Sequence, residues 1–235
     1  MTADGVTADG RTPGRAALVV VEGIDGSGKS TLGRRIVDEV RATGRSADWY
    51  PNKNLAPVRD TLDAIAREEG HADRFAMLGR DEAQFLASIL KWRDMLDLTD
   101  DLARPGHVVV LDRYYYTHLA LAAVSGTANL PRLRRLYELL PVPDAVLLLD
   151  LPPALALERV TARNTDTNSL SFLSRFRDAY RGLEEYEEGG FTTLDATGTA
   201  DEVFTEAWSR LRSVLPARPP EAAGSAAART PEAAR

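Results

Sequence analysis

The stretch ALVVVEGIDGSGKST, from Ala17 to Thr31, decides the fold class of this chain. Its first half is apolar and β-branched, which is typical of a buried strand. Its second half, Gly23 to Ser30, matches the pattern G-x-x-x-x-G-K-[ST], and residues with helical spacing follow it. A strand, a glycine-rich turn and a helix in this order let backbone N–H groups surround a phosphate chain at the positive end of the helix. The stretch therefore predicts binding of a nucleoside triphosphate, and we expect ATP.

The side chains of this loop have separate expected tasks. Lys29 is long enough to reach the β- and γ-phosphates, and the hydroxyl of Ser30 is placed to coordinate Mg²⁺. The glycines allow the backbone to approach the phosphates closely. The residues expected to line the donor site are Gly23, Asp25, Gly26, Ser27, Gly28, Lys29, Ser30 and Thr31.

Apolar runs and segments of helical spacing alternate along the rest of the chain. We expect strands at 16–23, 46–50, 107–112, 145–150 and 191–195, and helices at 30–44, 56–69, 81–102, 130–140, 152–163, 170–188 and 200–215. Such alternation predicts an α/β fold in which helices cover both faces of a parallel sheet. Ligands of such sheets bind beyond the carboxyl ends of the strands, where Gly23, Asp112, Asp150 and Asp195 stand.

Length and composition limit the class of protein. The chain has 235 residues, contains no cysteine and carries a formal net charge of −6. Its size suits one α/β domain, its acidity argues against a nucleic-acid partner, and no apolar run approaches the length of a membrane span. Residues 1–15 and 216–235 have no apolar face, so we expect two disordered tails around a domain of residues 16–215. The N-terminus lacks the apolar core of a signal peptide, and we expect a cytoplasmic protein.

An acid and a base, Asp112 and Arg113, stand at the end of the apolar run VVVL. A P-loop protein needs an acid at a neighbouring strand end to hold Mg²⁺ or its water, and Asp112 has that position. The guanidinium of Arg113 offers a planar fork of donors that suits a phosphate. An enzyme that transfers the γ-phosphoryl group to a second phosphate needs such a cation, whereas a simple ATPase needs only the acid. The alternative interpretation is a surface salt bridge that closes the strand.

Four segments, taken together, resemble a known family. VVVEGIDGSGKST, VVVLDRYYYTHLALA, LLLDLPPALALERVTAR and LDATGTADEVFTEAW resemble, in this order, the P-loop, the Asp-Arg motif, the strand and helix before the lid, and the last strand of thymidylate kinases. The resemblance implies the nucleoside monophosphate kinase fold, a three-layer P-loop architecture with five parallel strands. It also implies transfer of phosphate from ATP·Mg²⁺ to dTMP. Because members of the family are often dimers, it implies a homodimer as well.

The same resemblance assigns roles on the acceptor side. Asp25 is expected near the acceptor sugar and the metal, and Lys53 takes the place of an Arg that grips the acceptor phosphate. Tyr114 matches a motif residue that contacts the nucleotide. Arg93 is the candidate for the family's thymine-directed Arg, and Ile89 stands in place of its stacking Phe. A solvated loop lysine is the alternative interpretation of Lys53.

Two further positions depart from the family pattern. Leu121 and Ala122 stand where thymidylate kinases have a Tyr-Gln pair near the base. We therefore expect the machinery for phosphate to be intact and the residues that read the base to differ.

The γ-phosphate also needs positive charge during transfer. The family supplies it from an Arg in the P-loop or from a basic lid, and the P-loop here has Gly26 and Ser27 instead. Arg159 and Arg163 stand four residues apart on one helical face that leads into the polar segment 164–171, and they are our candidates. A solvated helix face is their alternative interpretation. The residues expected to act in catalysis are thus Lys29, Asp112, Arg113, Arg159 and Arg163.

Three functions remain open at this point. The first is a kinase that phosphorylates dTMP. The second is a kinase of the same fold for a different nucleotide or a phosphorylated metabolite, which the changed base-reading positions favour. The third is an ATP-binding switch without an acceptor, which would not need Lys53, Arg93 and Arg113 in addition to the P-loop.

Overall fold

The sheet has five parallel strands in the order β2-β3-β1-β4-β5. The structure, a computed structural model, describes residues 15–53, 55–163 and 168–216. The strands are β1 (Ala17–Gly23), β2 (Ser46–Tyr50), β3 (His107–Asp112), β4 (Ala145–Asp150) and β5 (Thr192–Asp195). All residues of β1 and β3 are buried, because these strands lie inside a sheet that is covered on both faces. The five predicted strands and the predicted fold class are confirmed.

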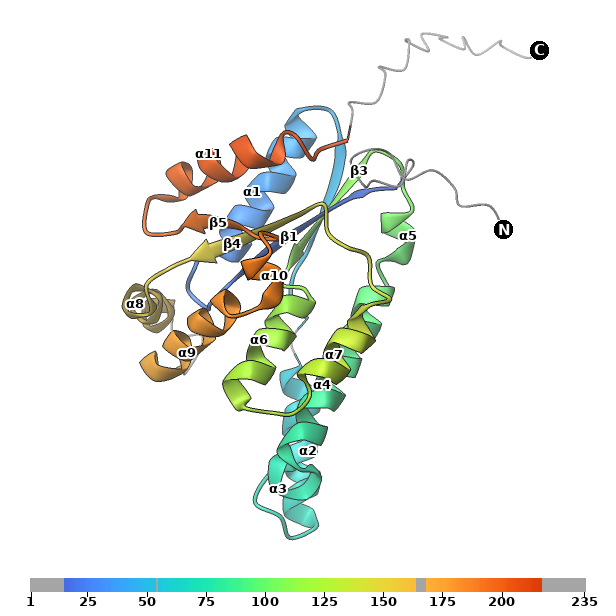
Figure 1. The fold of residues 1–235 in the computed structure, drawn as a ribbon, viewed down its shortest axis with the longest axis vertical. Coiled ribbons are helices and arrows are strands. Elements are labelled where there is room, and N and C mark those ends of the chain that lie inside the picture. The colour runs from blue at the N-terminus through green and yellow to red at the C-terminus, as the bar shows by residue number, and fades with distance from the viewer. Residues whose placement is uncertain (1–14, 54, 164–167, 217–235) are drawn as a thin grey trace, which may run out of the picture.

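Helices cover the two faces of the sheet in separate groups (Figure 1). One face carries α1 (Lys29–Ala42) and α11 (Ala200–Leu211). The other carries α4 (Arg80–Leu96), α6 (Tyr115–Ser125), α7 (Leu130–Tyr137) and α9 (Leu170–Arg181). The remaining helices are α2 (Ala56–Glu68), α3 (Arg74–Leu78), α5 (Thr99–Leu102), α8 (Pro153–Arg163) and α10 (Glu184–Glu187). In the view of Figure 1, α2 and α3 extend downward, away from the sheet.

Helix α1 is fixed against the sheet by its apolar face and by one glycine. Leu32, Ile36 and Val40 recur every four residues on the buried face of α1. At Gly33 a Cβ atom would lie 1.9 Å from the ring of Trp49 on β2, so only glycine lets the helix and this ring approach so closely. This close packing places the first turn of α1 at the carboxyl edge of the sheet.

Two predicted helices are interrupted. The helix expected at 81–102 consists of α4 and α5, and the helix expected at 170–188 ends at Arg181 and resumes as α10. Helix α3 was not predicted; it begins where the side chain of Asp73 accepts hydrogen bonds from two N–H groups, those of Phe75 and Ala76, both at 2.9 Å.

Two further predictions concern the tails of the chain and membrane-crossing segments. Apart from Arg15 and Pro216, the predicted tails at 1–15 and 216–235 lie outside the described residues. Among the helices of the described part, none combines the length and the apolar character that a membrane crossing requires.

Candidate active site

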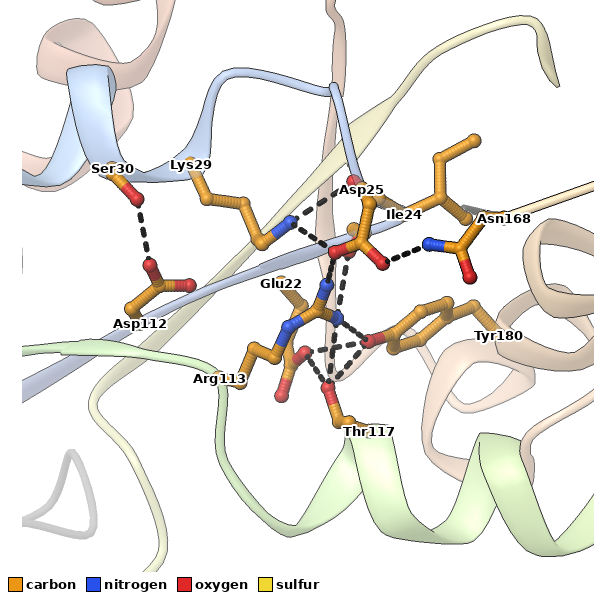
Figure 2. Close-up of polar contacts among 11 residues, drawn as sticks. Glu22, Ile24, Asp25, Lys29, Ser30, Asp112, Arg113, Thr117, Asn168 and Tyr180 are labelled. Carbon is orange, nitrogen blue, oxygen red and sulfur yellow. Dashed lines mark hydrogen bonds and ion pairs between the residues drawn. The ribbon is translucent and has the colours of Figure 1, made fainter. Parts of the chain in front are cut away.

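The P-loop joins β1 to α1 at the carboxyl edge of the sheet (Figure 2). Gly26 and Gly28 have φ angles of 85° and 98°, a region that favours glycine. A Cβ atom on Gly26 would lie 2.5 Å from the carbonyl oxygen of Ala156. Lys29 folds back over the loop, and its Nζ donates a hydrogen bond of 2.9 Å to the carbonyl of Ile24. The loop is thus held by contacts within itself, and the Lys29 ammonium lies close to the first turn of α1.

A polar cavity over this loop brings together residues far apart in the sequence. It combines the P-loop with the carboxyl end of β3 and with the end of α8. Its lining residues are Asp25, Gly26, Gly28, Lys29, Ser30, Thr31, Asn52, Asp112, Arg113, Val160 and Arg163.

Ser30 and Asp112 form a pair of oxygen ligands in this cavity. The hydroxyl of Ser30 donates a hydrogen bond of 2.8 Å to Oδ2 of Asp112 (Figure 2). The other carboxylate oxygen, Oδ1, is buried and has no hydrogen-bond partner among the described residues. A hydroxyl and a carboxylate are the hard oxygen donors that Mg²⁺ prefers beside phosphate oxygens. The two side chains therefore fit the metal that the sequence predicts.

The ammonium of Lys29 lies in an unusual electrostatic environment. Its side chain is buried, and this burial, together with the charge of Arg113, lowers the pKa of Lys29 to about 8. The carboxylates of Asp25 and Asp112 act in the opposite direction. Phosphate groups placed against Lys29 would stabilise its charged form, because they add negative charge at the same point.

Arg113 is held by a buried network (Figure 2). Its φ angle of 69° makes it the single non-glycine residue with positive φ in the described part of the chain. One nitrogen, NH1, donates to the carbonyl of Gly23 at 2.9 Å and to the hydroxyls of Tyr180 and Thr117 at 3.2 and 3.3 Å. The other, NH2, pairs with Asp25. The guanidinium is therefore fixed at the edge of the cavity rather than free in solvent.

Glu22 is the centre of this network, and our sequence analysis missed it. The side chain is fully buried and accepts hydrogen bonds from the Tyr114 N–H and the Thr117 hydroxyl, both at 2.7 Å, and from the Tyr180 hydroxyl at 2.8 Å. Burial raises the pKa of Glu22, while the charge of Arg113 opposes that rise. The signal for it was an acid placed inside an apolar strand, since a buried carboxylate needs a partner.

A second, larger cavity of about 540 Å³ lies on the other side of Asp25 and Arg113. Its volume suits a nucleotide-sized ligand. Its lining residues are Asp25, Asn52, Lys53, Leu55, Arg59, Gln84, Ala87, Lys91, Arg113, Thr117, His118, Leu121, Asn168, Phe172 and Phe176. We refer to it as the acceptor cavity. It includes Asp25, Lys53 and Arg113, three of the residues predicted to bind the acceptor.

Comparison with known proteins identifies the family. A sequence model described as thymidylate kinase matches residues 21–207. The thymidylate kinase of Xylella fastidiosa (strain M12) is 33% identical over 210 residues, which cover 86% of this chain and 89% of the relative. That of Xanthomonas oryzae pv. oryzae (strain PXO99A) is 33% identical over 207 residues, 84% of each chain.

The chain belongs to the thymidylate kinase family. It is therefore a nucleoside monophosphate kinase, as its resemblance to thymidylate kinases predicted. A solved thymidylate kinase from Candida albicans shares the fold, with a TM-score of 0.61 at 21% identity; the match covers 85% of this chain and 92% of that chain.

A third cavity lies on the donor side of the kinase. Its walls come from α1, β4, α8 and the residues that lead from β5 into α11. They are Ser27, Gly28, Thr31, Leu32, Arg35, Leu149, Arg159, Arg163, Ala196, Gly198, Ala200 and Val203. Thr199 caps α11 beside it: its hydroxyl accepts the Glu202 N–H, and its own N–H donates to the Glu202 carboxylate.

The two candidate lid arginines of the kinase both line this donor-side cavity. Arg159 donates a hydrogen bond of 3.2 Å to the carbonyl of Ala196, and Arg163 also lines the polar cavity over the P-loop. Two later arginines, Arg177 and Arg181, are instead paired with Asp150 at 2.6 and 2.7 Å. Of the predicted lid segment 164–171, residues 164–167 lie outside the described part.

Two predicted acceptor residues lie away from the cavities described above. Arg93 is exposed on α4, because it follows the cavity-lining Lys91 by two residues and so points about 200° around the helix from it. Tyr114 is buried in the core, and its hydroxyl donates to the carbonyl of Pro141 at 3.1 Å. The bond from its own N–H to Glu22 fixes this orientation.

His118, to which our sequence analysis assigned no role, is a buried wall residue of the acceptor cavity. Its Nδ1 lies 3.4 Å from the hydroxyl of Ser88. Burial, and then the charges of Lys91 and Arg113, lower the pKa of His118 to about 3. The imidazole is therefore neutral at pH 7.

This neutral histidine predicts that the free energy of unfolding decreases as the solution becomes more acidic. The pKa of His118 in the fold is below its unfolded value of about 6.5, so the unfolded chain binds the proton first; the contribution is present above pH 6.5 and is lost towards pH 3. Between pH 7 and 5 the group should cost about 2 kcal/mol of unfolding free energy. Urea unfolding at both pH values should show a smaller loss for His118→Gln and an unchanged loss for the exposed-site control His71→Gln. An equal loss in all three proteins would contradict the neutral buried state.

Proposed function

We propose that the protein transfers the γ-phosphoryl group of ATP to the phosphate of dTMP, which yields ADP and dTDP. One observation carries the proposal. The polar cavity over the P-loop and the acceptor cavity meet at three shared residues, Asp25, Asn52 and Arg113. Two adjoining cavities that meet at a fixed guanidinium suit transfer between two phosphates, whereas a switch that only binds ATP needs one cavity.

The proposed reaction consists of positioning and charge stabilisation. Backbone N–H groups of the P-loop and Lys29 hold the donor phosphates, and Arg163 adds positive charge from α8. Arg113 orients the acceptor phosphate against the γ-phosphate. The acceptor oxygens are already ionised at neutral pH, so the reaction needs no general base. Ser30 and Asp112 would hold Mg²⁺, which neutralises phosphate charge when it is bound.

Helix α9 and the residue Asn168 before it form the wall of the acceptor cavity next to Asp25. Phe172 and Phe176 line the acceptor cavity, and Asn168 donates a hydrogen bond of 2.9 Å to Asp25 (Figure 2). Excluding water strengthens the electrostatic interactions inside the site and prevents loss of the phosphoryl group to hydrolysis.

The test is ADP release with Mg·ATP and a panel of acceptors: dTMP, dUMP, UMP, dCMP, CMP, GMP and AMP. We expect kcat/KM to be highest for dTMP. Faster transfer to another nucleotide would mean that the base site, which Leu121 lines, accepts a base other than thymine. ATP binding without transfer to any acceptor would reject the kinase assignment in favour of a switch.

A further inference from the structure

The chain uses lysine at only three positions, Lys29, Lys53 and Lys91, and takes its other side-chain cations from arginine. All three line a nucleotide cavity. Lys29 belongs to the P-loop, and the other two line the acceptor cavity. An ammonium is a compact charge that suits a phosphate as well as a guanidinium does, but without a fixed fork. Lys53 and Lys91 are therefore the two lysine candidates for binding the acceptor phosphate.

Lys53 is already paired on the outside of the cavity. Its Nζ lies 3.0 Å from Asp94 and 3.3 Å from Asp97, and more than half of its side-chain surface is exposed. The hydrogen bond that the ammonium donates to the Asp94 carboxylate raises the pKa of Lys53. Its charge is thus balanced by two carboxylates and is screened by water.

Lys91 has the opposite surroundings. The residue is 8% exposed, and among the described residues its Nζ has a single hydrogen-bond acceptor, the Lys53 carbonyl at the limiting distance of 3.5 Å. Burial lowers the pKa of Lys91; the Asp94 carboxylate opposes this shift, and the charges of Lys53 and Arg113 add to it. Burying an ammonium with so few partners costs free energy unless an anion pairs with it.

The position along α4 places this ammonium at the phosphate end of the acceptor cavity. Gln84, Ala87 and Lys91 line the cavity in successive turns, and Met95, one turn further, packs in the core of the sheet. Lys91 is therefore the one of the three nearest to the sheet. The same edge carries Arg113 at the end of β3, whose charge acts on Lys91.

We propose that Lys91, together with Arg113, binds the phosphate of the acceptor nucleotide, and that Lys53 does not. The proposal deepens the proposed function and rests on it, since it needs an acceptor that carries a phosphate. In this proposal, Lys91 is the cation that α4 provides for the acceptor phosphate. The sequence analysis had predicted Arg93 on this helix instead.

The first test compares an acceptor with and without its phosphate. Calorimetric affinity for dTMP should fall about tenfold or more in Lys91→Met, the range for a lost hydrogen bond to a charged group. Affinity for thymidine should stay within about twofold, since thymidine lacks the phosphate. Lys91→Arg should recover most of the loss, and Lys53→Met should change dTMP affinity less than Lys91→Met does. Equal losses for dTMP and thymidine in Lys91→Met would show a packing role and overturn the proposal.

The second test observes the ammonium itself. Selective ¹³Cε labelling of lysine gives three side-chain signals, which the three single Lys→Arg variants assign. In a pH titration of the wild type, dTMP should raise the pKa of Lys91 and leave that of Lys53 nearly unchanged, whereas thymidine should move neither. A Lys91 signal that titrates identically with dTMP and thymidine would overturn the proposal. Turnover of dTMP by the wild type, measured separately, tests the proposed function, so the failure of one is distinguishable from the failure of the other.

Discussion

Replacing Lys29 by methionine should abolish phosphoryl transfer while the protein stays folded. The ammonium is buried over the P-loop, 2.9 Å from the carbonyl of Ile24, at the point where the β- and γ-phosphates are expected. Removal of a fixed positive charge at the transferring group should lower kcat by about a thousandfold or more. Methionine has a similar length and no charge, so the buried site loses a costly cation rather than a packing residue.

Steady-state ADP release and thermal unfolding measure the two halves of this prediction. The control is Arg67→Met, which removes an exposed cation at the end of α2, outside the cavities described above. The control should retain the activity of the wild type. A Lys29→Met protein whose kcat stays within tenfold of the wild-type value would contradict the role of Lys29.

Replacing Arg113 by methionine should separate acceptor binding from donor binding. The KM for the acceptor should rise about a hundredfold, because a fixed cation beside the acceptor phosphate is lost, while the KM for ATP changes far less. The same change should lower the free energy of unfolding by about 3 kcal/mol, because it leaves buried Glu22 and its neighbour Asp25 without their shared cation. Acceptor and donor kinetics, together with urea unfolding, measure these effects.

A double variant distinguishes the structural effect from the binding effect. Glu22→Gln in the Arg113→Met background removes the uncompensated buried carboxylate, so it should restore much of the lost stability. It should leave the acceptor KM as high as in the single variant, since no cation returns. Recovery of both properties together would mean that Arg113 acts only as a partner of Glu22, and equal weakening of ATP and acceptor would exclude the assigned role.

The strands of the fold could be predicted from sequence, and the divisions among the helices could not. Strands buried on both faces have apolar runs such as VVVL before Asp112, and these runs are distinctive. The break between α4 and α5 at Asp97–Leu98 has no glycine or proline to mark it, since both residues are compatible with a helix. Helix α3 depends on a cap at Asp73 that is too short a signal without the surrounding packing.

The active site divides in the same way. The P-loop residues, Asp112 and Arg113 could be predicted, because each stands in a motif at a strand end. Glu22, His118 and Tyr180 become functional candidates only through the packing of α6 and α9 against β1. Arg93 was predicted from the family resemblance, and Lys91 was not considered. The sequence does not show which side of α4 faces the cavity, and in the structure Lys91 is buried there while Arg93 is exposed.

The acceptor cavity and the donor-side cavity are built from largely separate stretches of the chain. Apart from Asp25, Asn168 and two phenylalanines of α9, the acceptor cavity is built from residues 52–121, whereas the donor-side cavity is built from residues 27–35 and 149–203. Asn52, Asp112 and Arg113 also lie within residues 52–121 and line the polar cavity over the P-loop, so in this segment only changes at the other lining residues alter the acceptor cavity and leave the phosphate site as it is. The positions at which the sequence analysis expects departures from the family, Ile89, Leu121 and Ala122, lie in or next to residues 52–121. Substitutions at those other lining residues are accordingly the changes expected to alter the choice of acceptor while the phosphate site is kept.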